Sequence, residues 1–214
     1  MPKRVDQAER RAHIVEALLA IVGQRGIDAV SLREVAQEAG VSMGAVQHYF
    51  ATKDEMLAYA LEHWLTLSVH QRFSQRIRDR AAVTGPHGTA APVDQADQAG
   101  QVDPVPVLLA LAAEFLPHDE ESRAGVRVAL AFIERAAAQP ELARAMRGAF
   151  TGFKETLQAL LAASDPDLDA SAEGLRLAAL LEGLRYAVLL GALPHRSAMA
   201  AVTRHLDSIG IRAG

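Results

Sequence analysis

The chain has 214 residues, of which 50% are hydrophobic and 22% charged, as expected for a globular protein with a substantial core. It contains no cysteine, which excludes disulfide bonds, thiolate metal sites and a cysteine nucleophile, and no stretch of it is predicted to span a membrane. The formal net charge is −4, although residues 1–53 carry seven basic against six acidic side chains. We therefore expect a cytoplasmic protein without membrane contact, and charge alone identifies no partner.

The N-terminal part has the hydrophobic period of α-helices, with expected ranges 7–25, 31–39, 42–50 and 52–80. Glycines are predicted to end the first two of these helices, at Gly26 and Gly40. The next three helices each begin at a hydroxyl residue that can accept a backbone hydrogen bond: Ser31, Ser42 and Thr52. At the first of these, Glu34 has the spacing of a capping box, in which the acid bonds back to the cap.

The rest of the chain is also predicted to be helical after an interruption. Residues 81–103 have no apolar face and several helix breakers, which indicates a mobile surface connection. Helical patterns resume at 105–116, 120–139, 141–163, 170–193 and 197–209. The fold class expected is therefore all-α, with about nine helices.

Residues 31–50 have the arrangement of a helix-turn-helix, with two short helices joined by a turn that contains Gly40. Their apolar positions predict the buried faces: Leu32, Val35, Ala36, Val41, Val46 and Phe50. The second helix of the pair then presents residues that can reach base edges, thymine methyl groups or phosphates: Ser42, Met43, Ala45, Gln47, His48 and Tyr49. This pattern predicts binding in the major groove of DNA.

Residues 31–57, above all 35–57, resemble the signature of the TetR family of transcription regulators. In that family, three N-terminal helices bind DNA, and a variable helical body binds a small ligand and forms the homodimer. Gln47 stands where the family commonly has tyrosine. This departure and the segments 116–121, 129–134 and 136–142 resemble the BetI-like branch. The resemblance implies a DNA-binding domain at 1–52 and a ligand-binding and dimerisation domain at 53–214.

The resemblance also implies the residues that meet DNA. Contacts to phosphates are expected from Ser31, Arg33, Tyr49 and Lys53, and contacts to bases or nearby backbone from Ser42, Met43, Ala45, Gln47 and His48. A glutamine amide at position 47 can form two hydrogen bonds with adenine. Further arm contacts are expected from Lys3, Arg4 and Arg11. The alternative for each of these residues is an ordinary solvent-exposed side chain.

Two other sets of residues follow from the same resemblance. The ligand is expected to contact Leu61, Trp64, Ser68, Phe132, Glu134 and Tyr186. Small residues recur at every fourth position of the helix before last, at Ala179, Gly183 and Ala187, which lets another helix approach closely. The dimer interface is therefore expected in the last two helices, at Leu180, Gly183, Leu184, Ala187, Val202 and Leu206. Polar residues on otherwise apolar helices are the best candidates to orient the ligand: Glu134, Glu182 and Arg185. The alternatives are a helix-surface or dimer-interface position for these three and an ordinary core for the apolar residues.

Taken together, these observations predict a ligand-responsive repressor that binds a palindromic operator as a homodimer and is released by a small-molecule effector. No catalytic motif and no metal-ligand spacing occurs, so no enzyme activity, metal or cofactor is expected. Two alternatives stay open. The first is a small-molecule-binding or catalytic helical protein with a vestigial helix-turn-helix, and the second is a constitutive, architectural DNA-binding protein.

Overall fold

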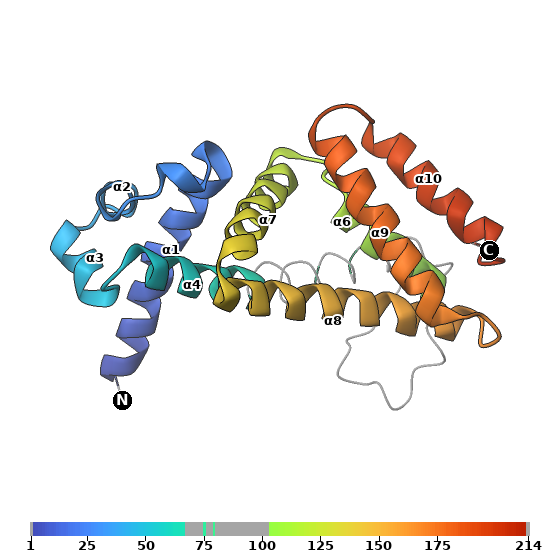
Figure 1. Ribbon diagram of the computed structural model, residues 1–214, viewed down its shortest axis with the longest axis horizontal. Helices are drawn as coiled ribbons and strands as arrows, with labels where there is room; N and C mark the ends of the chain where they lie inside the picture. Colours follow the sequence, from blue (N-terminus) through green and yellow to red (C-terminus); the bar gives the residue numbers. More distant parts are fainter. Residues whose placement is uncertain (1, 67–74, 76–78, 80–102, 213–214) are drawn as a thin grey trace. The chain divides into compact units, whose positions relative to one another are not determined.

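The computed structural model describes residues 2–66, 75, 79 and 103–212, except for the side chains of residues 2–6. Within this part of the chain, the all-α prediction is confirmed, with no strand and nine α-helices (Figure 1). None of the described helices is long and apolar enough to cross a membrane. The predicted connection at 81–103, apart from Asp103, and the predicted ligand residue Ser68 lie outside the described residues.

The helices lie close to the ranges that the hydrophobic pattern predicts. They are α1 (Pro2–Arg25), α2 (Leu32–Glu38), α3 (Met43–Tyr49), α4 (Lys53–Trp64), α6 (Pro104–Phe115), α7 (Glu120–Ala138), α8 (Pro140–Ser164), α9 (Ala170–Leu189) and α10 (His195–Ser208), with a 3-10 turn, η1 (Ile27–Ala29).

Helix α1 begins at Pro2, five residues before its predicted start, and the predicted end of the fourth helix at residue 80 lies outside the described residues. Two ends near the C-terminus differ from the predicted ones for identifiable reasons. Helix α9 ends at Leu189, four residues before the predicted end, because Gly191 has a φ of 73° and turns the chain back. Helix α10 begins at His195, directly after Pro194, where the missing N–H of proline costs no helical hydrogen bond. Both differences arise from the loop between these two helices.

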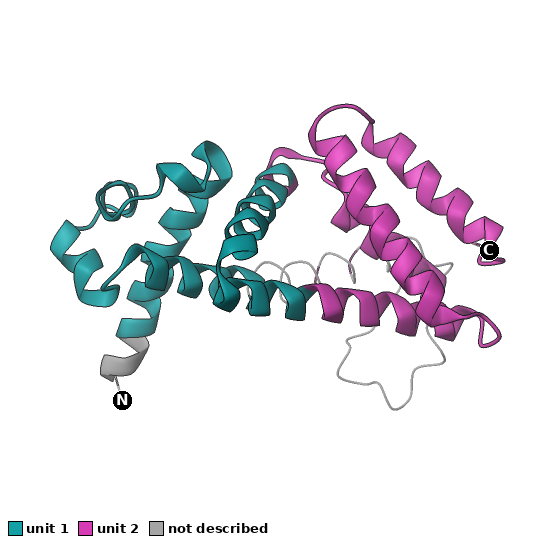
Figure 2. Cartoon of the chain, viewed as in Figure 1, with its two compact units in different colours: residues 1–71, 123–149 teal, residues 72–122, 150–214 magenta. Residues whose placement is uncertain are grey.

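The chain forms two compact units (Figure 2). Unit 1 consists of residues 1–71 and 123–149, and unit 2 of residues 72–122 and 150–214. By packing, α4 and residues 123–149 thus belong with the N-terminal helices. The division after residue 52 predicted above is a division of function, and it stays a prediction.

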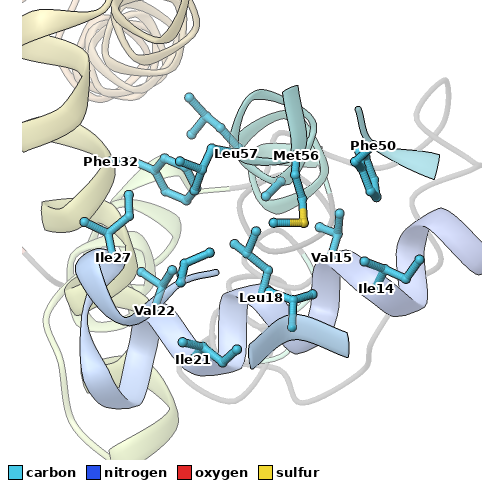
Figure 3. Close-up of a cluster of buried hydrophobic side chains, with 14 of the residues drawn as sticks. Ile14, Val15, Leu18, Ile21, Val22, Ile27, Phe50, Met56, Leu57 and Phe132 are labelled. Carbon is cyan, nitrogen blue, oxygen red and sulfur yellow. The ribbon is translucent and has the colours of Figure 1, made fainter. Parts of the chain in front are cut away.

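The core of unit 1 joins α1, α4 and α7. Leu18, Met56 and Phe132, one from each helix, are fully buried, and their side chains converge in Figure 3. Gly23 lies next to α7, where a Cβ atom would be in ordinary contact, 3.5 Å from the Cβ of Ala124. Burial of this apolar surface is the main force that holds the N-terminal helices to α7.

The core of unit 2 joins α6, the second half of α8, α9 and α10. Its fully buried residues include Leu108, Leu157, Leu181 and Val202. Gly174 of α9 lies directly against α8, where a Cβ atom would come within 3.4 Å of the Cα of Gln158. The absence of a side chain at this glycine therefore sets the separation of α8 and α9.

Candidate nucleic-acid interface

The helix-turn-helix begins and turns as its sequence predicts. The Ser31 and Ser42 hydroxyl oxygens accept hydrogen bonds from the backbone N–H groups of Glu34 and Ala45, each at 3.1 Å. Between the helices, Gly40 has a φ of 65°, in the left-handed region that favours glycine. Cap, turn and cap thus fix where α2 ends and where α3 starts.

The predicted capping box at Ser31 is only half formed. The Glu34 carboxylate accepts a hydrogen bond from the Arg25 guanidinium at 2.9 Å, and Arg25 also lies 3.9 Å from Glu38. A charged donor at the end of α1 is a stronger partner for a carboxylate than a backbone N–H. Arg25 therefore ties α2 to α1, a contact between distant residues that the local pattern does not reveal.

Helix α3 has one buried and one exposed face. Val46 and the C-cap residue Phe50 are fully buried in the core of unit 1. The exposed residues are Ser42, Met43, Gln47 and His48, whereas Ala45 and Tyr49 are half-buried. The structure thus brings the predicted base-reading residues to one surface of unit 1, and α3 lies at the periphery of that unit (Figures 1 and 2).

The predicted phosphate-binding residues lie on the neighbouring elements of unit 1. Ser31 and Arg33 are exposed at the start of α2, and Lys53 is half-buried as the first residue of α4. The Ser31 hydroxyl accepts from a backbone N–H, so its own hydrogen remains able to donate to a phosphate oxygen. Hydrogen-bond donors to phosphate are thus available both before α3 in the chain, at the start of α2, and after it, at the start of α4.

Arg11 lies in a different environment from the one expected of a DNA-binding arm. Its guanidinium lies over the rings of Phe50 and Tyr59, with its Cζ 4.8 Å and 4.4 Å from their centroids. The side chains of Lys3 and Arg4, the other expected arm residues, lie outside the described ones. Nothing in the local sequence pattern predicts the contacts of Arg11, because both rings lie about forty or more residues away along the chain.

Asp54, next to Lys53 at the start of α4, binds α7. Its carboxylate accepts hydrogen bonds from Arg135 at 2.9 Å and from Gln139 at 3.4 Å. The Arg135 hydrogen bond, followed by that of Gln139, lowers the pKa of the Asp54 carboxyl below its ordinary value. The first turn of the helix that carries Lys53 is therefore held in place by α7.

Four of the residues predicted to contact a ligand lie in unit 1, three of them in or at its core and one on its surface. Leu61 and Phe132 are completely buried in its core, and Trp64 lies half-buried at the edge of that core. Glu134 is exposed and lines a surface hollow of about 580 Å³ together with Arg127. The structure thus brings Leu61, Trp64 and Phe132 together in one core, without Glu134, and their ligand role stays a prediction.

Unit 2 contains a cluster of aromatic and charged side chains around the buried Arg185. Its guanidinium forms an ion pair with Glu182 at 2.7 Å and lies 4.5 Å from the centroid of Phe115. Phe115 in turn stacks on Phe153 at 4.4 Å, and the ring centroid of the predicted ligand residue Tyr186 lies 5.4 Å from the Arg185 guanidinium. The sequence indicated Glu182 and Arg185 as candidates to orient a ligand but assigned no site role to either phenylalanine, since only the fold brings these helices together.

The residues predicted for the dimer interface fall into two groups in unit 2. Gly183 is exposed, and Leu180, Leu184 and Ala187 are half-buried on α9. Val202 and Leu206 are at most 2% exposed and pack within the core of unit 2, because α10 turns this face towards its own chain. Two further leucines are exposed, Leu175 of α9 at 52% and Leu190, the C-cap of this helix, at 81%. The sequence did not single out Leu190, which follows the helix.

Among the described residues, no group of three or more His, Asp or Glu side chains is placed to hold a metal ion. Helix α3 presents hydrogen-bond donors and acceptors on its exposed face. Gln47 can both donate and accept, and His48 can do either according to its tautomer. Such a surface is suited to reading base edges in a groove.

Comparison with known proteins agrees with this geometry. Residues 14–60 match the family described as bacterial regulatory proteins, tetR family, and residues 104–210 match the BetI-type transcriptional repressor C-terminal family. The HTH-type transcriptional regulator PksA of Bacillus subtilis is 31% identical over 180 residues, which cover 82% of this chain and 77% of PksA.

Two solved structures are also similar. A transcriptional regulator from Rhodococcus sp. Rha1 is 28% identical, with a TM-score of 0.69 and coverage of 93% of this chain and 95% of that one. The multidrug binding protein EbrR, solved with imidazole, is 27% identical, with a TM-score of 0.57 and coverage of 92% and 94%. EbrR has also been solved with malachite green.

Proposed function

Because the chain belongs to the TetR family of transcriptional regulators and has a BetI-type C-terminal domain, we propose that it is a homodimeric repressor released from its operator by a small molecule. The proposal has three parts, which are the reading of DNA by α3, the pairing of two chains through α9, and the response to an effector. Each part rests on different residues and can fail independently of the others.

DNA reading is supported above all by the two faces of α3. The helix is anchored by Val46 and Phe50, while Met43, Gln47 and His48 are exposed beside one another. In this proposal, these three residues, with Ser42 and Ala45, face bases or the adjacent backbone in the major groove. Phosphates are contacted by Ser31 and Arg33 before α3 in the chain, by Tyr49 at its end and by Lys53 after it.

Pairing of two chains is supported by the exposed apolar residues of α9. Leu175, Gly183 and Leu190 lie within one face of this helix, where side chains repeat at intervals of seven or eight residues. Two DNA-reading helices must be about 34–36 Å apart to enter successive major grooves on one side of B-DNA. A dimer joined through α9 therefore binds a palindromic operator with two half-sites.

Release by a small molecule is supported by the relatives. EbrR binds imidazole and malachite green, and by analogy the helical body of this chain takes up an organic effector. The predicted contacts are Leu61, Trp64, Ser68, Phe132, Glu134 and Tyr186. Effector binding lowers operator affinity by the coupling free energy between the two sites, typically about 1–3 kcal/mol. The protein thus acts in the cytoplasm by binding, not by catalysis.

A mobility-shift titration on the DNA upstream of the protein's own gene tests the proposal. The same duplex with its palindrome scrambled is the control, at a fixed salt concentration because phosphate contacts make affinity salt-dependent. We expect binding that is at least about a thousandfold tighter on the intact sequence. Equal binding to both duplexes would leave only an architectural role, and no binding to either would leave the helix-turn-helix without a function.

A further inference from the structure

Arg11 lies at the joint between the DNA-reading helix and the helix that follows it. Helix α3 ends at Tyr49 with Phe50 as its C-cap, and α4 starts at Lys53. The guanidinium carbon of Arg11 lies 4.8 Å from the centroid of the Phe50 ring and 4.4 Å from that of Tyr59 on α4. One cation on α1 thus contacts an aromatic ring on each side of the joint.

The short connection itself belongs to the same network. The Glu55 carboxylate lies 3.5 Å from the Arg11 guanidinium through one oxygen, and its other oxygen accepts the backbone N–H of Ala51 at 2.9 Å. Ala51 is one of the residues that connect α3 to α4. Arg11 therefore contacts the C-cap of α3 and two residues of α4, and through Glu55 it is linked to the connection between the two helices.

We propose that Arg11 is a positioning residue for DNA recognition, which fixes the angle at which α3 leaves the joint, and that it is not a phosphate contact. This inference rests on the proposed function of α3. Phe50 is completely buried, so the cation lies against a ring that cannot move without disturbing the core. The position of Phe50 sets the direction of α3, because Phe50 directly follows its last residue.

The chemistry of the side chain supports a role that only arginine can fill. A planar guanidinium can lie flat on aromatic faces while its edges bond a carboxylate, whereas the ammonium of lysine is a compact point charge. The Nε atom of Arg11 is buried and has no hydrogen-bond partner among the described residues. The side chain is 33% exposed, and its Nη2 atom faces Glu55 at 3.5 Å, so only part of the guanidinium remains available to a phosphate.

The dependence of DNA affinity on salt separates positioning from phosphate binding. Each phosphate contact that is lost reduces the slope of log Kd against log salt concentration by about one. The test uses a fluorescent duplex that the full-length protein selects from a random-sequence pool. Binding is measured by anisotropy between 50 and 300 mM KCl, about the range over which such slopes are determined. The variants are Arg11→Lys, Arg11→Met and, for comparison, Arg33→Met at a predicted phosphate contact.

If Arg11 positions α3, Arg11→Lys and Arg11→Met both weaken binding by about tenfold at each salt concentration, with the slope unchanged. Arg33→Met reduces the slope by about one. Two results would overturn the proposal. One is full affinity of Arg11→Lys together with a reduced slope for Arg11→Met, which would make Arg11 a phosphate contact. The other is unchanged affinity of both variants alongside a lower unfolding temperature.

Glu55→Gln provides a second variant that preserves the fold, since its amide oxygen still accepts the Ala51 N–H. It removes the charge that faces Arg11, and we expect an affinity loss of the same sign and a smaller size than that of Arg11→Met, again without a change in slope. An unchanged affinity for Glu55→Gln would count against the network. Failure of the wild-type protein to select any sequence would instead refute the proposed function, so the two failures are distinguishable.

Discussion

The Nε2 atom of His13 lies 2.8 Å from the carbonyl oxygen of Ala39. A carbonyl only accepts, so Nε2 carries the hydrogen in this contact. Ala39 is the C-cap of α2, where helix carbonyls lack a partner within the helix. The bond joins the middle of α1 to the turn of the helix-turn-helix, and it leads directly to a prediction about the stability of that turn.

Replacing His13 with alanine is expected to lower the free energy of unfolding by about 1 kcal/mol, the usual value of one such hydrogen bond. His13→Gln supplies an amide donor and should recover part of the loss. Urea unfolding followed by circular dichroism measures both variants. Equal destabilisation by glutamine and alanine would show that the amide cannot replace the ring donor at Ala39.

Gly40 is the position of the turn where backbone conformation requires glycine. Gly40 has a φ of 65°, which is unfavourable for a residue with a Cβ atom, so Gly40→Ala is expected to destabilise the protein by about 1–2 kcal/mol. The matched control is Gly125→Ala in α7, where nothing lies within 4 Å of the added Cβ and the φ is not in the left-handed region. The control should gain up to about 1 kcal/mol from helix propensity. Thermal unfolding of both variants compares the signs, and a stabilising Gly40→Ala would contradict the strained-turn argument.

These two examples show which parts of the fold the sequence could reveal. Gly40 and the serine caps act within a few residues, so their spacing in the sequence predicts the turn and the helix starts. His13 and Arg11 act on residues far away along the chain, and no local pattern identifies their partners. The same reason explains why the partner of Glu34 was predicted incorrectly. Its spacing indicated a capping box, whereas in the structure its carboxylate binds Arg25.

The helix periodicity was also sufficient to assign the exposed face of α3, since Val46 and Phe50 determine which side is buried. It was insufficient for α10. An apolar stripe indicates that a face is covered, but it cannot distinguish a partner subunit from the chain's own core. Val202 and Leu206 pack in the latter, whereas Gly183 on α9 remains exposed.

Gln47 gives a prediction about sequence selectivity. Its side chain is exposed on α3, so Gln47→Ala should leave the fold intact. If the amide reads a base, the variant loses about 1–3 kcal/mol of discrimination at one operator position and little elsewhere. Competition binding with single-base operator variants measures this. A uniform loss on all sequences would instead make Gln47 a backbone contact.

The ion pair between Asp54 and Arg135 gives a pH-dependent prediction. The Arg135 hydrogen bond lowers the pKa of Asp54 in the folded protein. A group of this kind stabilises the fold above its unfolded-state pKa, about 3.9 for aspartate, and this stability is lost as the pH falls through the lower folded-state value. Asp54→Asn should therefore be less stable than wild type at pH 7, with the difference shrinking below about pH 3.9.

Urea midpoints of wild type and Asp54→Asn between pH 7 and pH 2.5, about the range that spans this titration, check the sign. Arg135→Gln is the matched variant and should show the same narrowing, because it removes the other member of the pair. A difference that stays constant down to the lowest pH would mean that Asp54 stabilises the fold independently of its charge.

Gly183 gives the prediction that tests the pairing of two chains. It is exposed on α9, and nothing lies within 4 Å of a Cβ atom built on it, so a single chain can accommodate a larger side chain there. Gly183→Arg should preserve the fold but place a charge in the centre of the proposed interface, where burial of an unpaired cation is unfavourable. We expect sedimentation velocity to show monomers.

Operator binding should weaken when dimerisation is lost, because each chain then binds a single half-site without the second one held nearby. Loss of this effective concentration costs about a hundredfold in affinity or more. Gly125→Arg is the control, since its Cβ position is equally open but lies on α7. If Gly183→Arg remained dimeric with full operator affinity, the chains would pair through another surface, and the exposed leucines of α9 would need a different partner.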